Sequence, residues 1–144
     1  MPDSTDRTDV MNLLRTVPLF SNLDDRHLKT LAQAAVDRTY NQGDLIVPQG
    51  EKGIGFYLIA EGQVRVEKAG TTVAILGPGQ FFGEMALIYG ATRSADVRAV
   101  GPTRCFVLFP WMFWGAVGED PEALGVLLRE TVRRLRHVEP GPED

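Results

Sequence analysis

Residues 82–95 carry side chains that suit a phosphorylated sugar. Gly83 lets a ligand approach the backbone closely, and residues 84–88 can form one helical turn whose free N–H groups attract an anion. On the next strand, Arg93 brings a guanidinium fork that fits a phosphate, and Ser94 adds a hydroxyl. The carboxylate of Glu84 would repel a phosphate, but it accepts hydrogen bonds from sugar hydroxyls. This combination indicates a site for a phosphorylated ribose. The spacing fits equally a structural salt bridge between Glu84 and Arg93 within a loop.

A second stretch, residues 46–62, has a simpler interpretation. It reads Ile-Val-Pro-Gln-Gly-Glu-Lys-Gly-Ile-Gly-Phe-Tyr-Leu-Ile-Ala-Glu-Gly. Its glycines permit turns, and its apolar run can fill a core. This pattern predicts a strand, a turn, a buried strand and another turn, all with a structural role.

The region that must position these side chains has β-sheet character. From Val36 to Phe109, short apolar or alternating runs are separated by glycines. Strands every ~8–12 residues with turn signals are typical of a sandwich, barrel or jelly roll. Leu58 and Ile59 are too apolar for an edge strand. We therefore expect a mostly β fold, a β-roll or jelly roll of about eight strands. The runs that predict strands lie at residues 45–47, 56–60, 64–66, 73–76, 97–100 and 105–109.

Helices are expected on both sides of this region. Residues 10–14 suggest a short helix, and residues 24–35 an amphipathic helix that follows the capping sequence Ser-Asn-Leu-Asp. After the strands, Pro110 opens a helix that ends near Gly118, because proline is favoured at the first helical position. Pro121 then opens a last helix that runs to about His137. Its apolar stripe consists of Leu124, Leu128, Val132 and Leu135.

Composition excludes several classes of protein. The chain has 144 residues, the size of one domain, with a formal net charge of −4. This weakly acidic balance argues against a dedicated nucleic-acid binder. The single Cys105 allows neither an internal disulfide nor a cysteine-based zinc site, and it lies in an apolar run that predicts inert core. His27 and His137 do not form a metal-ligand spacing or lie on expected strands, which argues against a metal-dependent enzyme on a β-barrel.

The ends of the chain are polar. Residues 1–9 are predicted to be a disordered lead, and residues 139–144 a disordered acidic tail, which leaves a domain at 10–138. The N-terminus begins with a methionine that resembles a natural start, and it lacks the pattern of a signal peptide. No segment reaches the ~20 apolar residues that span a bilayer. A cytoplasmic protein without membrane partners is therefore expected.

Both stretches together resemble the signature patterns of the cyclic nucleotide-binding domain. Residues 82–95 are similar to its phosphate-binding cassette, Phe-Gly-Glu-x-Ala-Leu followed by Arg-Ser-Ala. The resemblance covers roughly residues 10–138 and includes Val-Pro-Leu-Phe at 17–20 as well as the two C-terminal helices. The family fold is a β-roll with flanking helices. The implied function is that of a sensor in signal transduction, not an enzyme, with cyclic AMP or cyclic GMP as ligand and neither cofactor nor metal.

The resemblance also implies roles for individual residues. Arg93 would bind the cyclic phosphate, and Glu84 would accept the ribose 2′-hydroxyl. Backbone contacts would come from Gly83, Met85 and Ala86, and Ser94 and Ala95 would complete the phosphate cradle. The base would lie near Val66, Val73 and Ala74. The last helix would close over it with Val138 and one arginine of 133–136, such as Arg134, stacked on the purine.

Departures from the family pattern leave an alternative open. Asp96 stands where eukaryotic members usually have threonine, and it would weaken binding if it faced the phosphate. The chain is therefore either a cyclic nucleotide sensor or a degenerate domain that serves only interaction or dimerisation. Ser94 is compatible with cyclic AMP, which we expect to be preferred, and with cyclic GMP.

The implied output is a partner protein. The residues after Phe109 are too few for two helices and a DNA-binding domain as well. We expect an unidentified protein effector, reached through the C-terminal helix, and a homodimer is compatible with that helix. Three aromatics, Trp111, Phe113 and Trp114, must point in different directions on the penultimate helix, so at least one tryptophan is expected at the surface.

Overall fold

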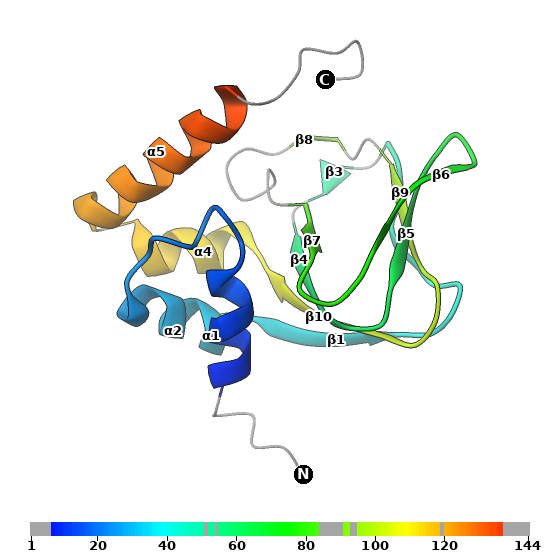
Figure 1. The fold of residues 1–144 in the computed structure, drawn as a ribbon, viewed down its shortest axis with the longest axis horizontal. Coiled ribbons are helices and arrows are strands. Elements are labelled where there is room, and N and C mark those ends of the chain that lie inside the picture. The colour runs from blue at the N-terminus through cyan, green and yellow to red at the C-terminus, as the bar shows by residue number, and fades with distance from the viewer. Residues whose placement is uncertain are drawn as a thin grey trace.

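The computed structural model describes residues 7–50, 52–53, 55–83, 91–92, 95–118 and 120–136. Figure 1 shows the helices of these ranges gathered on one side and the strands on the other. The helices are α1 (Thr8–Arg15), α2 (Asp25–Ala34), α4 (Pro110–Val117) and α5 (Pro121–Arg136). The strands are β1 (Val36–Tyr40), β2 (Leu45–Val47), β3 (Lys52–Gly53), β4 (Phe56–Glu61), β5 (Val64–Lys68), β6 (Thr71–Leu76), β7 (Phe81–Phe82), β8 (Ala91–Thr92), β9 (Asp96–Ala99) and β10 (Thr103–Leu108).

Two antiparallel sheets form the roll. Their strand orders are β1-β10-β4-β7 and β2-β9-β5-β6, and a separate two-stranded sheet pairs β3 with β8. The two sheets enclose one hydrophobic core, to which strands of both contribute. Its buried members are Val47, Tyr57, Ile59, Val64, Val97, Cys105 and Val107. The expected β-roll with flanking helices is confirmed.

Strand β4 is buried on both faces. Tyr57 and Ile59 face the core of the roll, whereas Phe56 and Leu58 belong to a second core shared with the helices. Because adjacent residues of a strand point to opposite faces, a strand covered on both faces must be apolar throughout. The order of the sheet places β4 between β10 and β7, so the prediction that this run is no edge strand is confirmed.

The second core joins the helices to the outer face of the β4–β10 pair. Phe20 makes an edge-to-face contact with Phe56, with ring centroids 5.5 Å apart, and a tilted contact with Phe113 at 5.7 Å. All three rings are fully buried. Aromatic pairs of this kind add to the free energy gained from burial. The helical layer is therefore fixed to the sheet that carries β7, the strand that leads into the cassette.

Helix boundaries agree closely with the expected ones. Asp24 caps α2 by accepting a hydrogen bond from the backbone N–H of His27, and Pro110 occupies the first position of α4. Helix α1 begins at Thr8 rather than at Val10, within the stretch expected to be a disordered lead. Arg7 explains the earlier start, because its guanidinium donates to the carbonyls of Ala32 and Ala35 at the end of α2.

No helix in the described ranges combines the length and the apolar character needed to cross a membrane.

Candidate functional site

The expected site residues divide into two groups. Gly83, Ala95, Val66, Val73 and Ala74 lie within the described structure. The others lie outside the described residues, or their side chains do: Glu84, Met85, Ala86, Arg93, Ser94 and Val138 for the whole residue, and Arg134 of α5 for its side chain. The structure therefore describes the frame of the cassette, which consists of β3, β7, Gly83, β8 and Ala95, rather than its interior.

A short ribbon connects the two stretches that the sequence singled out. Strand β3 comes from the first stretch and β8 from the second, and they pair antiparallel with Lys52 opposite Thr92 and Gly53 opposite Ala91. Figure 1 shows this ribbon above β4 and β7, at the open end of the roll. The first stretch thus does more than fill the core, because it also holds the cassette in place. Sequence reasoning missed this role, since nothing in the spacing signals which residues pair across such a distance.

The two ends of the cassette are held by different sheets. At its start, Phe82 pairs with Tyr57 of β4, and the two rings stack with their centroids 4.8 Å apart. Gly83 then turns the chain with φ of +84°, a left-handed conformation that strains any residue with a side chain. At the end of the cassette, Ala95 is buried and leads into β9 of the other sheet. Residues 84–94 therefore connect the two sheets.

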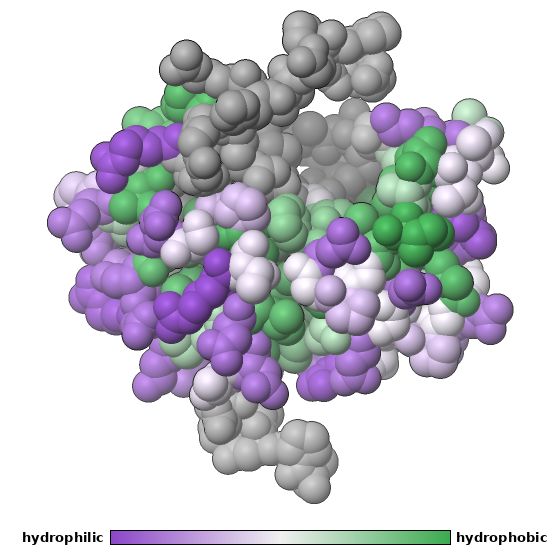
Figure 2. All heavy atoms as spheres, viewed as in Figure 1, coloured by the Kyte–Doolittle hydropathy of each residue, from purple (hydrophilic) through white to green (hydrophobic). Residues whose placement is uncertain are grey.

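Two of the three expected base-contacting residues form one row across the second sheet. Ala74 of β6 lies opposite Val66 of β5, which lies opposite Val97 of β9. Val66 packs against the core of the roll, so this row offers an apolar floor. Val73 is separate from it, because it is the extra residue of a β-bulge and is 55% exposed. Figure 2 shows hydrophobic atoms at the surface on this side of the roll.

Asp96 has a structural partner. Its Oδ1 accepts a hydrogen bond from the backbone N–H of Gln49, with N and O 2.6 Å apart. This bond connects the first stretch to the start of β9, next to Ala95. The sequence left open whether the Asp96 carboxylate faces the phosphate; in the structure it is hydrogen-bonded to the backbone of the first stretch.

Charged side chains on the same sheet neutralise one another. Arg65 and Arg98 lie directly opposite in the register of β5 and β9, where like charges repel. Glu67 offsets this repulsion, since its carboxylate contacts Arg65 Nε at 2.5 Å and Arg98 Nε at 3.7 Å. These two arginines are therefore committed to a structural network.

Cys105 is an inert core residue, as expected. Its side chain is completely buried, and burial raises the pKa of the thiol to about 12 because it disfavours the charged thiolate. The thiolate is the nucleophilic form, so this cysteine is unreactive at neutral pH.

Helices α4 and α5 expose apolar side chains. The expected surface tryptophan is confirmed, with Trp111 62% and Trp114 39% exposed. On α5, Leu128 and Val132 of the predicted stripe are also exposed, whereas Leu124 packs against the helical core. Among the stripe side chains that the structure describes, Leu124 thus faces the domain and the other two are open to solvent.

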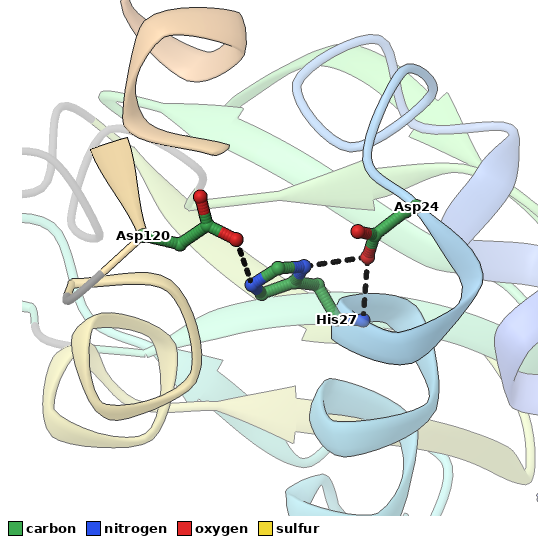
Figure 3. A group of neighbouring side chains, drawn as sticks. All are labelled: Asp24, His27 and Asp120. Carbon is green, nitrogen blue, oxygen red and sulfur yellow. Dashed lines mark hydrogen bonds and ion pairs between the residues drawn. The ribbon is translucent and has the colours of Figure 1, made fainter. Parts of the chain in front are cut away.

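A cluster at the helical end was not foreseen. His27 lies between Asp24 and Asp120, with Nδ1 2.5 Å from the first carboxylate and Nε2 3.2 Å from the second. The capping sequence indicated Asp24, but Asp120 is far from both residues along the chain. Only tertiary packing brings the three together (Figure 3).

Comparison with known proteins supports a single family. The family model described as "Cyclic nucleotide-binding domain" matches residues 37–116, more than half of the chain. The cAMP-dependent protein kinase regulatory subunit of Yarrowia lipolytica is 39% identical over 84 residues, which are 58% of this chain and 22% of that protein. The chain spans about a fifth of the length of such curated relatives.

Solved structures with this fold include two close matches. The N-terminal domain of a transcriptional regulator from Streptomyces coelicolor superposes with a TM-score of 0.79 and 29% identity, over 86% of this chain and 90% of that one. The regulatory domain of Toxoplasma gondii PKA, crystallised with cAMP, has a TM-score of 0.77 and 26% identity, over 95% of this chain and 51% of that one.

Proposed function

Because the chain belongs to the cyclic nucleotide-binding domain family, we propose that it is a cytoplasmic sensor that binds cyclic AMP and signals to a partner protein through α5. The observation that carries this proposal is the frame around residues 84–94. The β3–β8 ribbon and the left-handed Gly83 frame the cassette on one side, and the buried Ala95 leads into β9, whose Val97 belongs to the apolar row of Ala74, Val66 and Val97. We propose residues 10–138 as the functional domain.

Within this frame, each cassette residue has a proposed role. Arg93 pairs with the cyclic phosphate, and Glu84 accepts the ribose 2′-hydroxyl. The backbone of Gly83, Met85 and Ala86, together with Ser94 and Ala95, surrounds the phosphate. Val66 and Ala74 form the floor for the base, and Val73 borders it.

Helix α5 supplies the proposed cover and output. Arg134 and Val138 close over the purine, since a guanidinium stacks well on a planar base. The exposed Leu128 and Val132 offer an apolar surface for the effector protein or for a second copy of the chain. Occupancy is thereby converted into a change at a surface that a partner can contact.

The proposed preference for cyclic AMP rests on Ser94. The hydroxyl of Ser94 serves the phosphate in this proposal, which leaves nothing on that residue to select the guanine amino group. The similar proteins do not decide between the two nucleotides, because the Yarrowia regulatory subunit and the Toxoplasma domain carry cAMP in their names, whereas cGMP-dependent protein kinase 2 of Homo sapiens carries cGMP.

Calorimetric titration tests the proposal. The chain is titrated with cyclic AMP, cyclic GMP and 2′-deoxy cyclic AMP under identical conditions. We expect cyclic AMP to bind tightest and the 2′-deoxy analogue about tenfold or more weaker, because a hydrogen bond to a charged group contributes ~1.5–3 kcal/mol. Absence of binding to every nucleotide would favour the degenerate domain instead, and equal affinity for the deoxy analogue would remove Glu84 from the site.

A further inference from the structure

A buried imidazole joins α2 to the start of α5. His27 lies in the first turn of α2 and is 5% exposed. Figure 3 shows its ring between two carboxylates, with Asp24 on one side and Asp120 on the other. Nδ1 is 2.5 Å from Asp24 Oδ1, and Nε2 is 3.2 Å from Asp120 Oδ2. Nδ1 is therefore hydrogen-bonded to Asp24, and Nε2 forms an ion pair with Asp120 when the ring is protonated.

The same carboxylates begin two helices. Asp24 caps α2 by accepting from the backbone N–H of His27 at 3.0 Å. Asp120 Oδ1 accepts from the backbone N–H groups of Glu122 and Ala123 at 3.0 and 3.2 Å, at the start of α5. Each carboxylate is thus fixed to its own helix. The ring between them connects the two helix starts directly.

The two contacts are not equivalent when a proton is lost. A neutral imidazole has one N–H and one lone pair, so both contacts are favourable only for the doubly protonated ring. The Asp24 contact is local, since this residue also caps the turn that carries the ring. The neutral ring can keep its proton on Nδ1 for Asp24, and the ion pair between Nε2 and Asp120 is then lost. Loss of the proton consequently acts on α5 and spares α2.

The charged groups around the ring are compatible with both its doubly protonated and its neutral form. Those that face it are Asp24, Asp120 and Arg26, whose guanidinium is 3.2 Å from Asp120 Oδ2. From α4, Gly115 and Ala116 contribute no charge to the adjoining cleft of about 480 Å³, which Thr30 and Pro121 also line. Arg26 gives Asp120 a second partner when the ring is neutral. The backbone N–H of His27 lowers the pKa of Asp24 below its usual 3.8, which keeps this carboxylate ionised near neutral pH.

A proton fits this cluster better than a metal ion. The three side chains each offer a ligand atom, and these atoms lie within 4.8 Å of one another. Asp24 Oδ1 and His27 Nδ1, however, are 2.5 Å apart, which is closer than two ligand atoms of one ion lie when each metal–ligand bond is about 2 Å. A shared proton accounts for this contact directly (Figure 3).

We propose that Asp24, His27 and Asp120 form a proton-dependent clasp that fastens the start of α5 to α2. The clasp is closed when the imidazole carries two protons and open when it is neutral. Histidine is the side chain that ordinarily changes charge near neutral pH, so the fastening of α5 is expected to respond to pH. This inference concerns the protein without ligand, and it stands whether or not a nucleotide binds.

The test follows the ring proton and the helix in one sample. The full chain with His137→Gln retains His27 as its single imidazole, because the sequence has 2 histidines. Ring-nitrogen NMR reports the protonation state, and hydrogen exchange gives protection factors for amides 124–127. We expect a doubly protonated ring at pH 6 and a neutral ring protonated on Nδ1 at pH 8.5. Protection in the first turns of α5 should fall about threefold over the same interval, a change typical of one ion pair.

Two variants separate the clasp from a general effect of pH. Asp120→Asn keeps the helix cap, and its amide can donate to the neutral Nε2, so protection in α5 should no longer fall. Asp25→Asn removes a neighbouring carboxylate that contacts Arg15 instead of the ring, and it should behave as the parent. The proposal is wrong if α5 protection stays constant while the ring loses its proton. It is equally wrong if the ring does not titrate between pH 6 and 8.5, or if Asp120→Asn retains the full response.

Discussion

Arg93 is the residue whose loss should weaken nucleotide binding most. In the proposed site it is the cation that neutralises the cyclic phosphate, and Arg65 and Arg98 are not expected to replace it because Glu67 engages both. Truncating one partner of a buried charge pair costs roughly 2–5 kcal/mol. We expect Arg93→Ala to raise the calorimetric Kd on the order of 30-fold or more. The control is Arg15→Ala, which removes a surface ion pair with Asp25 on the helical side. Binding within about threefold of the parent would contradict the role of Arg93.

Gly83 should matter for both folding and binding. Its φ of +84° is strained for alanine, so Gly83→Ala should lower the free energy of unfolding by about 1–2 kcal/mol in urea denaturation. Gly70 provides a matched control, because its φ is +81° and an added Cβ would meet nothing within 4 Å. Gly70→Ala should lose similar stability without a change in nucleotide affinity, whereas Gly83→Ala should also weaken binding. Equal affinities for the two variants would separate Gly83 from the site.

At the scale of elements, a variant of Asp96 distinguishes a structural role of this carboxylate from repulsion of the bound phosphate. The Gln49 bond links the first stretch to β9, and a hydrogen bond to a charged group contributes ~1.5–3 kcal/mol. We expect Asp96→Ala to lower the free energy of unfolding by about 1–2 kcal/mol, since the site is partly exposed, and to leave cyclic AMP binding equal or weaker. If affinity rose instead, the carboxylate would be repelling the phosphate.

The edge of the first sheet should respond to acid. A hydrogen bond from Arg104, together with its charge, holds the pKa of Asp37 below its usual 3.8. A lowered pKa in the folded state gives stability that is present above 3.8 and is lost as pH falls further. The pair is partly exposed, so the loss should not exceed about 1 kcal/mol. The free energy of unfolding, measured by urea denaturation, should decrease less between pH 6 and pH 2.5 for Arg104→Gln than for the parent. Arg15→Gln, whose partner Asp25 is largely exposed, should match the parent.

Local signals predicted the elements well, and distant contacts explain what they missed. Pro110 and Pro121 mark the starts of α4 and α5 because proline fits the first helical turn wherever it occurs. The double-sided apolar character of β4 likewise follows from its own residues. The β3–β8 ribbon and the early start of α1 depend on partners such as Thr92 and Ala35, whose identity no local pattern reveals. The site motif can be recognised from the sequence because its residues are close together along the chain, whereas the clasp joins His27 to Asp120, which is far from it along the chain.

At the scale of the whole molecule, we propose the α5 helix as the part through which nucleotide binding reaches a partner. It follows α4 after Gly118, and Figure 1 shows its far end directed away from α2. A ligand shifts such an element only by binding one of its positions more tightly than another. In our proposal the difference comes from contacts of α5 with the purine, so the helix and the cassette should respond together.

Hydrogen exchange with and without cyclic AMP tests this coupling. We expect nucleotide to raise protection in residues 121–138 as well as in 82–95, because closure orders the helix over the base. Removal of all residues after Arg129 should weaken binding by a few kcal/mol at most, since the truncated chain keeps the Arg93 and Glu84 contacts but loses the cover. Leu128→Ser serves as a control, because it changes an exposed leucine of the stripe and should leave nucleotide affinity unchanged. If nucleotide protected only the cassette, α5 would be a fixed brace, and the signal would have to pass through the β3–β8 ribbon or another part of the roll.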